Sequence, residues 1–135
     1  MSVSSKTTNQ RPPLIFIADD HPGLLQMAEI LLTAEGYQCR LFSTPEDVLA
    51  VMAAERMQPD LLLTDFEMGS MNGLELVKRC RSAHPGLKTI LVSGTVEEAV
   101  VLCHPVKVNQ FLSKPYQPQV LLSIVRSLLA DEPPV

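Results

Sequence analysis

Four short apolar runs of the sequence are each followed by polar residues that could do chemistry. These residues are three carboxylates, one hydroxyl and one amine: Asp19, Asp20, Asp65, Ser93 and Lys114. Aspartate favours turns, so any one of them could belong to an ordinary polar loop. That explanation accounts poorly for the whole set, because the residues that follow the strands of a parallel sheet meet at one edge.

Three carboxylates and one lysine in a small cleft would leave two negative charges uncompensated. Like charges at close range raise a pKa or recruit a cation. Mg²⁺ fits best, because it takes only one or two protein carboxylates and keeps water and phosphate oxygens as its other ligands. Beside such an ion, an aspartate can act as a nucleophile toward phosphorus. Lys114 and the metal would then offset charge on the phosphoryl oxygens, and the Ser93 hydroxyl would donate to one of them.

The elements that must position these residues follow from the hydrophobic pattern. Short apolar runs predict five strands, at 14–18, 37–42, 61–64, 87–92 and 111–113. Helical spacing and capping residues predict five helices, at 22–35, 45–57, 72–84, 95–103 and 117–130. We expect Leu24 and Met27 to face the core from the first helix, and Thr95 to cap the fourth. Strict alternation of strand and helix predicts a parallel sheet with helices on both faces.

Length and composition indicate one globular domain. The chain has 135 residues, of which 46% are hydrophobic and 19% are charged, so wholesale disorder is excluded. We place the domain at 14–130, between a disordered tail at 1–13 and a short tail at 131–135. The net charge of −4 argues against a nucleic-acid or anionic membrane partner.

Targeting signals and cysteine content point to the cytoplasm. No apolar run approaches the roughly 20 residues of a spanning helix, and the start has no apolar core of a secretory signal. The three cysteines, Cys39, Cys80 and Cys103, are odd in number and far apart. This pattern predicts free, buried thiols in a reducing compartment.

The ordered set of residues resembles the receiver domain of two-component response regulators, over roughly 14–130. An acidic pair ends the first strand, and Asp65 follows the third strand 45 residues after Asp20. Ser93 stands in the Thr/Ser position of that family, and Lys114-Pro115 follows the fifth strand. The resemblance implies a doubly wound, flavodoxin-like α/β/α fold with strand order 2-1-3-4-5.

The resemblance also implies a role for each residue. Asp65 would accept a phosphoryl group from a phosphohistidine, which makes the chain a phosphoacceptor with at most slow self-catalysed phosphorylation and dephosphorylation rather than an enzyme. Mg²⁺ would be held by the side chains of Asp20 and Asp65, by the backbone carbonyl of Glu67 and, through water, by Asp19. Ser93, Lys114 and Phe111 would bind the phosphoryl group and switch, Glu67 and Thr95 would tune its lifetime, and Pro115 would follow a cis peptide bond.

Partners follow from the same resemblance. A sensor histidine kinase or a histidine phosphotransfer protein would dock its histidine-bearing helix near Leu24. Leu122 and Leu129 lie off the main apolar stripe of the last helix and suggest a homodimer or a downstream protein target. Pro105 must end the fourth helix early, so that helix is expected to be short or displaced.

Three other functions compete with this interpretation. A pseudo-receiver would act only as a protein-interaction module. Such domains usually lack one of the acidic residues or the lysine, and this chain has all of them. Phosphatases of the haloacid-dehalogenase type place their nucleophile after the first strand, which disagrees with Asp65. A flavin module would need a phosphate loop after that strand, where this chain is acidic. The sequence leaves open whether the chain acts alone or belongs to a larger regulator or hybrid kinase.

Overall fold

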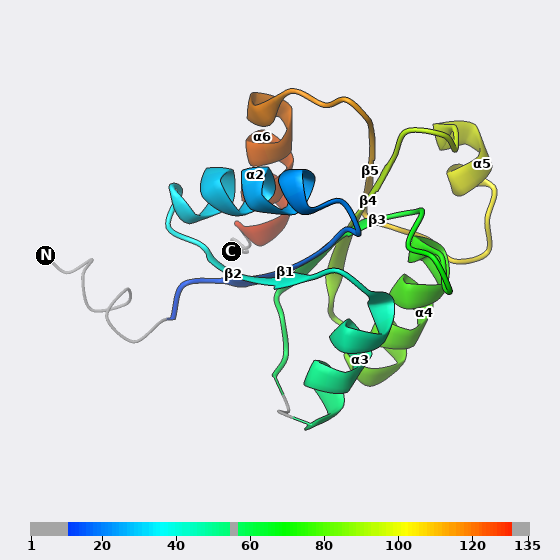
Figure 1. Cartoon of the computed structure of the whole chain (residues 1–135), viewed down its shortest axis with the longest axis horizontal. Helices are drawn as coiled ribbons and strands as arrows, with labels where there is room; N and C mark the ends of the chain where they lie inside the picture. Colours follow the sequence, from blue (N-terminus) through cyan, green and yellow to red (C-terminus); the bar gives the residue numbers. More distant parts are fainter. Residues whose placement is uncertain (1–10, 55–56, 131–135) are drawn as a thin grey trace, which may run out of the picture.

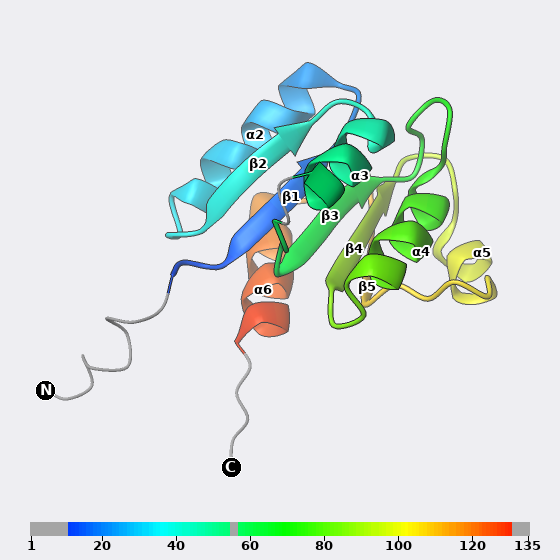
Figure 2. The same ribbon diagram turned by 90° about the horizontal axis from the view of Figure 1, so that it is seen from below.

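The computed structural model describes residues 11–54 and 57–130, which form a five-stranded parallel sheet between two layers of helices (Figures 1 and 2). The strands are β1 (Leu14–Ala18), β2 (Gln38–Phe42), β3 (Leu61–Asp65), β4 (Lys88–Ser93) and β5 (Gln110–Ser113). The helices are α2 (Pro22–Thr33), α3 (Pro45–Ala54), α4 (Gly73–Ala83), α5 (Glu98–Leu102) and α6 (Pro118–Leu129). The strand order is β2-β1-β3-β4-β5, so the predicted topology is confirmed.

The two faces of the sheet bury separate clusters. Figure 1 shows α2 and α6 on one face and α3 and α4 on the other. Along β1, Ile15 and Ile17 pack toward α2 and α6, whereas Phe16 packs toward α3 and α4. Every residue of β1 and β3 is buried, as expected for strands covered on both faces.

The tails expected at 1–13 and 131–135 largely fall outside the described residues. Within the described part, the carbonyl oxygen of Pro13 accepts a hydrogen bond of 2.9 Å from the backbone N–H of Gln38. The third helix is predicted to reach 57, but residue 57 is not helical, and residues 55 and 56 lie outside the described ranges. No described helix combines the length and the apolar character that crossing a bilayer requires.

The buried stripe of α2 differs from the predicted one. Leu25, Ala28 and Leu32 face the sheet, and Met27 is 40% exposed, so the prediction that Met27 belongs to the core is wrong. Leu24 is half-buried. Because neighbouring apolar residues could form either stripe, the docking of the helix on the sheet selects between them.

Helix α5 is shorter than predicted. It begins at Glu98 rather than after Thr95, because the backbone N–H groups of Thr95 and Val96 both donate to the Ser93 hydroxyl oxygen, at 3.1 and 2.9 Å. These bonds hold the segment after β4 in a turn, so the prediction that Thr95 caps the helix is wrong. The helix ends at Leu102, ahead of Pro105, as expected.

The start of α4 lies very close to the end of β3. A Cβ atom on Gly73 would lie 2.5 Å from the carbonyl oxygen of Asp65 and 2.7 Å from Cδ1 of Leu91. The Gly73 N–H also donates to the carbonyl oxygen of Phe66, at 2.8 Å. Glycine is therefore required where helix α4 leaves the loop that follows Asp65.

We expect Gly73→Ala to lower the free energy of unfolding by about 1–3 kcal/mol, the usual cost of overpacking, because backbone atoms of the sheet cannot move aside. Gly86→Ala is the matched control, since a Cβ atom there meets nothing within 4 Å. Chemical denaturation of both variants measures the difference. Equal stabilities would contradict the close approach at Gly73.

Candidate functional site

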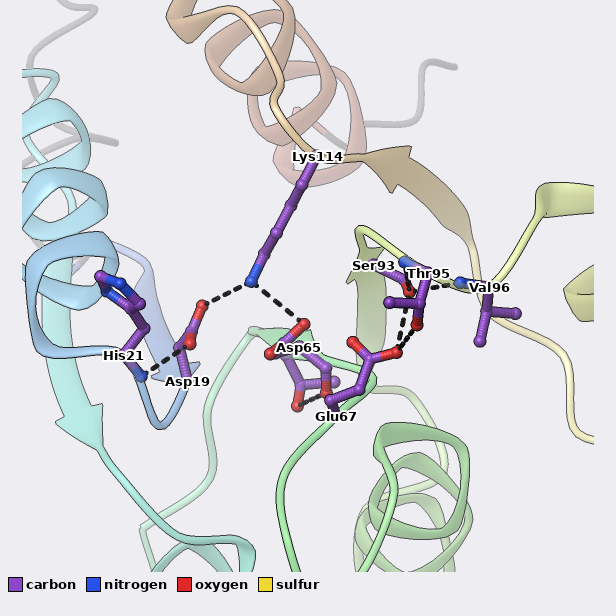
Figure 3. Close-up of polar contacts among 9 residues, drawn as sticks. Asp19, His21, Asp65, Glu67, Ser93, Thr95, Val96 and Lys114 are labelled. Carbon is purple, nitrogen blue, oxygen red and sulfur yellow. Dashed lines mark hydrogen bonds and ion pairs between the residues drawn. The ribbon is translucent and has the colours of Figure 1, made fainter.

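Strand register brings the predicted site residues to one edge of the sheet. Ala18 pairs with Thr64, so Asp19, just after β1, lies beside Asp65, the last residue of β3. Ser93 pairs with Ser113, and the Lys114 N–H donates to the carbonyl oxygen of Ser93 at 2.9 Å. Figure 3 shows Lys114 reaching from the end of β5 between the two aspartates.

The three aspartates form an acidic cluster. Asp19, Asp20 and Asp65 each offer a carboxylate oxygen, and these oxygens lie within 4.8 Å of one another. Asp19 and Asp65 are 8% and 5% exposed, whereas Asp20 is exposed. The Asp19 carboxylate is oriented by the backbone N–H of His21, which donates to Oδ1 at 2.9 Å.

Lys114 neutralises only part of this charge. Its Nζ lies 3.3 Å from Oδ2 of Asp19 and 3.2 Å from Oδ1 of Asp65. Burial alone would lower the pKa of Lys114, but the nearby charges of Asp19 and Asp65 outweigh it and raise that pKa. The lysine therefore stays protonated and two negative charges remain. The Lys114–Pro115 peptide bond is cis.

Asp65 is the least satisfied group of the cluster. Its Oδ1 is buried and has no hydrogen-bond partner among the described residues, although it lies within ion-pair distance of Lys114. Burial raises the pKa of the Asp65 carboxyl, and the charge of Asp19 raises it further. A buried carboxylate of this kind is stabilised by an additional positive charge.

The donor set fits a hard divalent cation. Three carboxylates at one rim supply oxygen ligands, which Mg²⁺ prefers, and the exposed Asp20 leaves the rim open to water and to phosphate oxygens. Among the described residues, the cluster contains no cysteine or histidine, and the backbone N–H of the nearby His21 donates to Asp19.

A second polar group adjoins the cluster. The Ser93 hydroxyl donates to Oε2 of Glu67 at 3.3 Å, and the Thr95 hydroxyl donates to the same oxygen (Figure 3). Sequence reasoning marked Glu67 and Thr95 but missed this contact. No pattern in the sequence could reveal it, because the two partners lie on different loops 28 residues apart.

A groove lies beside the lysine. It is lined by Leu24, Met27, Pro115 and Tyr116 together with Lys114, and its volume is about 320 Å³. Sequence reasoning identified Leu24 here, but it placed Met27 in the core and did not single out Tyr116, which is half-buried. Burial raises the pKa of Tyr116, with a further contribution from Asp19.

Other predicted residues lie farther from the cluster. Phe111 is half-buried and packs against a small hydrophobic group formed by Leu74, Leu91 and Val101. Leu122 and Leu129 are partly buried against the core beneath α2 and α6, and the homodimer or downstream partner that they suggest stays a prediction.

The three cysteines are free. Burial raises the pKa of Cys80 to about 12, and burial together with Glu29 raises that of Cys39 to about 11. Cys103 is exposed and Cys39 is half-buried, so the prediction of three buried thiols holds only for Cys80. Cys103 follows the short helix α5, which buries only Val101 in the core.

The raised pKa of Asp65 has a consequence for stability. The folded protein holds this proton more tightly than the unfolded chain does, so stability falls as pH rises through the interval between the two pKa values. In metal-free buffer at pH 7 we therefore expect Asp65→Asn to raise the melting temperature, by roughly 4 °C for each kcal/mol gained. The gain should fade as pH falls toward 3.8, the ordinary value for aspartate.

Thermal melts across this pH range, with a chelator present, measure the effect. Asp60→Asn is the control, because Asp60 is exposed and precedes β3 at the opposite edge of the sheet. Its carboxylate accepts a hydrogen bond from the Leu14 N–H at 2.8 Å, which the amide oxygen of asparagine can also accept. A melting temperature of Asp65→Asn at or below that of the wild type at pH 7 would show that the ionised carboxylate is not destabilising.

Comparison with known proteins agrees with this arrangement. Residues 15–126 match the family model of the response regulator receiver domain. The chain is 28% identical, over 93% of its length, to the transcriptional regulatory protein GlrR of Escherichia coli, and 29% identical, over 88%, to the DNA-binding response regulator MtrA of Mycolicibacterium smegmatis. It spans 28% of the length of the first relative and 53% of the second.

Solved structures agree as well. A CheY-like response regulator receiver domain from Methanospirillum hungatei superposes with a TM-score of 0.78 at 27% identity, covering 86% of this chain and 92% of that one. A receiver domain of an HD domain-containing protein from Pseudomonas fluorescens, at 24% identity and a TM-score of 0.80, shares the fold. The chain belongs to the response regulator receiver domain family of two-component signal transduction.

Proposed function

We propose that this receiver domain accepts a phosphoryl group on Asp65 from the phosphohistidine of a sensor histidine kinase or a histidine phosphotransfer protein. The observation that carries the proposal is the buried Oδ1 of Asp65, which lacks a hydrogen-bond partner in the described part of the chain and lies beside Lys114 within an acidic cluster. The domain at 14–130 would be the phosphoacceptor unit.

The residues present fit Mg²⁺ as the cofactor. The side chains of Asp20 and Asp65 and the backbone carbonyl of Glu67 would hold it, with Asp19 acting through water. When bound, the ion would offset negative charge on the phosphoryl oxygens. This cation would also compensate the charge that Lys114 leaves unbalanced.

The chain's own residues then carry the transfer. A carboxylate oxygen of Asp65 attacks phosphorus, the P–N bond to the donor histidine breaks, and the electron pair of that bond leaves with the imidazole. Lys114, already paired with Asp65 at 3.2 Å, can follow the charge onto a phosphoryl oxygen. Ser93 lies at the end of the adjacent strand β4, where its hydroxyl can donate to another oxygen.

Phosphorylation adds a charge of about −1.5 to −2 at this edge, which can reposition a hydroxyl and a loop. Movement of Ser93 would reach Phe111 through β4, because Phe111 packs against Leu91 of that strand. Phe111 is therefore the candidate aromatic switch, and the changed surface near α5 would be presented to a downstream protein target. A direct nucleic-acid or membrane contact is not part of the proposal.

The groove beside Lys114 suits the histidine-bearing helix of the partner. Leu24, Met27 and Tyr116 give it an apolar lining, and Ile30 continues the apolar surface along α2 with 67% exposure. A helix that lays apolar side chains in this groove would bring its phosphohistidine to the rim where Asp65 lies. We infer that the chain meets such a partner in the cytoplasm.

A pseudo-receiver is the second candidate function, but the intact cluster of Asp19, Asp20 and Asp65 with Lys114 favours a working phosphoacceptor. A haloacid-dehalogenase-like phosphatase is disfavoured, because the carboxylate without a hydrogen-bond partner, that of Asp65, lies at the end of β3 rather than after β1. We infer that the chain is no enzyme beyond slow self-catalysed phosphorylation and dephosphorylation.

Incubation with acetyl phosphate and Mg²⁺, followed by intact-mass measurement, tests the function. We expect the mass of one phosphoryl group to be added to the wild type, because Asp65 supplies the only carboxylate in the described part of the chain that is buried without a hydrogen-bond partner. The gain should be lost in Asp65→Asn and on chelation of the metal.

Asp60→Asn is the matched control and should be modified like the wild type, since Asp60 precedes β3 rather than following it. An unmodified wild type would favour the pseudo-receiver. Steady turnover of p-nitrophenyl phosphate would favour the phosphatase instead.

A further inference from the structure

The carboxylate of Glu67 accepts hydrogen bonds from two hydroxyl groups, one at the end of β4 and one in the turn that follows. Ser93 Oγ donates to its Oε2 at 3.3 Å, and Thr95 Oγ1 donates to the same atom. Figure 3 shows the Glu67 side chain pointing toward both hydroxyls, with Asp65 close by. The contact therefore bridges the loop after Asp65 and the turn that precedes α5.

The Ser93 hydroxyl is fully used in this arrangement. It is 1% exposed, and its oxygen accepts from the N–H groups of Thr95 and Val96 at 3.1 and 2.9 Å. A serine hydroxyl can donate one hydrogen bond, and here the Glu67 carboxylate accepts it. Ser93 can donate to a phosphoryl oxygen on Asp65 only after it releases Glu67.

We propose that Glu67 is a positioning residue that latches Ser93 and Thr95 in the unphosphorylated arrangement, and that a phosphoryl group on Asp65 competes with the Glu67 carboxylate for the Ser93 proton. The proposal rests on the proposed function, since it takes Asp65 as the phosphoacceptor. It assigns to Glu67 a part in the resting state of the switch, through its side chain.

Electrostatics acts in the same direction as this competition. The pKa of Asp65 is raised by burial, by Asp19 and also by Glu67, so the negative charge of Glu67 is felt at the acceptor carboxylate. A phosphoryl group adds about −1.5 to −2 charge at the same place. It therefore repels the Glu67 carboxylate while offering Ser93 a more highly charged acceptor.

Release of the latch would free the whole turn after β4. Thr95 loses its side-chain acceptor when Glu67 moves, and the N–H groups of Thr95 and Val96 follow the oxygen of Ser93 because they donate to it. These two amides thus report the state of the latch through their hydrogen bonds to the Ser93 oxygen.

The experiment compares backbone amide NMR shifts of the full chain, wild type and Glu67→Ala, without ligand and with beryllofluoride and Mg²⁺ as the phosphoryl mimic. In ligand-free Glu67→Ala we expect the Thr95 and Val96 amides to move toward their positions in the beryllofluoride-bound wild type. Beryllofluoride should bind at least about tenfold more tightly, the lower end of what one hydrogen bond to a charged group is worth. Glu67 is exposed, so the variant should fold.

Two further variants separate the latch from a general charge effect. In a Ser93→Ala background, Glu67→Ala should give no gain in affinity, because the contested proton is gone. Glu75→Ala removes an exposed carboxylate that pairs with Arg79 on α4, and it should change neither amide nor the affinity.

Unchanged Thr95 and Val96 shifts in Glu67→Ala would overturn the latch, and so would an affinity gain that persists without Ser93. A wild type that binds no beryllofluoride, yet shows Glu67-dependent shifts, would overturn the phosphoacceptor function and the competition at Asp65, while the Glu67–Ser93 contact stands.

Discussion

Because parallel strands end at the same edge of the sheet, burying the apolar strands of the core also brings carboxylates that repel each other close together there. The core requires β1 and β3 to lie side by side, which brings Asp19, just after β1, beside Asp65, the last residue of β3. Two carboxylates about 5 Å apart repel by on the order of 3 kcal/mol at an effective dielectric constant of 20. Each large apolar side chain buried in these strands contributes about 1.5–3 kcal/mol, so the core dominates and the acidic cluster persists.

The acidic cluster therefore carries uncompensated negative charge, and an added positive charge would stabilise it. Lys114 neutralises part of the negative charge through two ion pairs, and Oδ1 of Asp65 still lacks a hydrogen bond within the described residues. The same uncompensated charge explains why we propose both a divalent cation and a phosphoryl group as ligands of one rim. The Glu67 carboxylate adds a resting partner for Ser93, so the site has a defined arrangement before it is modified.

The strands and the acidic cluster could be predicted from the sequence because each depends on local patterns. Apolar runs indicate buried strands, and because parallel strands end at one edge of the sheet, the residues at their ends are predicted to lie together. The outward rotation of Met27 on α2 could not be predicted, because two apolar stripes compete and tertiary packing decides between them. The late start of α5 was hidden for a similar reason, since Ser93 takes the N–H groups that a helix start would have left free. The need for glycine at position 73 depends on a carbonyl of the preceding strand, which no helix signal describes.

The central claim is that the edge of the sheet holds three carboxylates poised for a single divalent cation. Calorimetric titration of the full chain with Mg²⁺ tests it most directly, using Asp20→Asn as the variant, because Asp20 is exposed and its change leaves the core intact. We expect saturable binding of one ion to the wild type and an affinity at least about tenfold weaker in Asp20→Asn. Absence of saturable binding, or equal affinity in the two proteins, would contradict the claim.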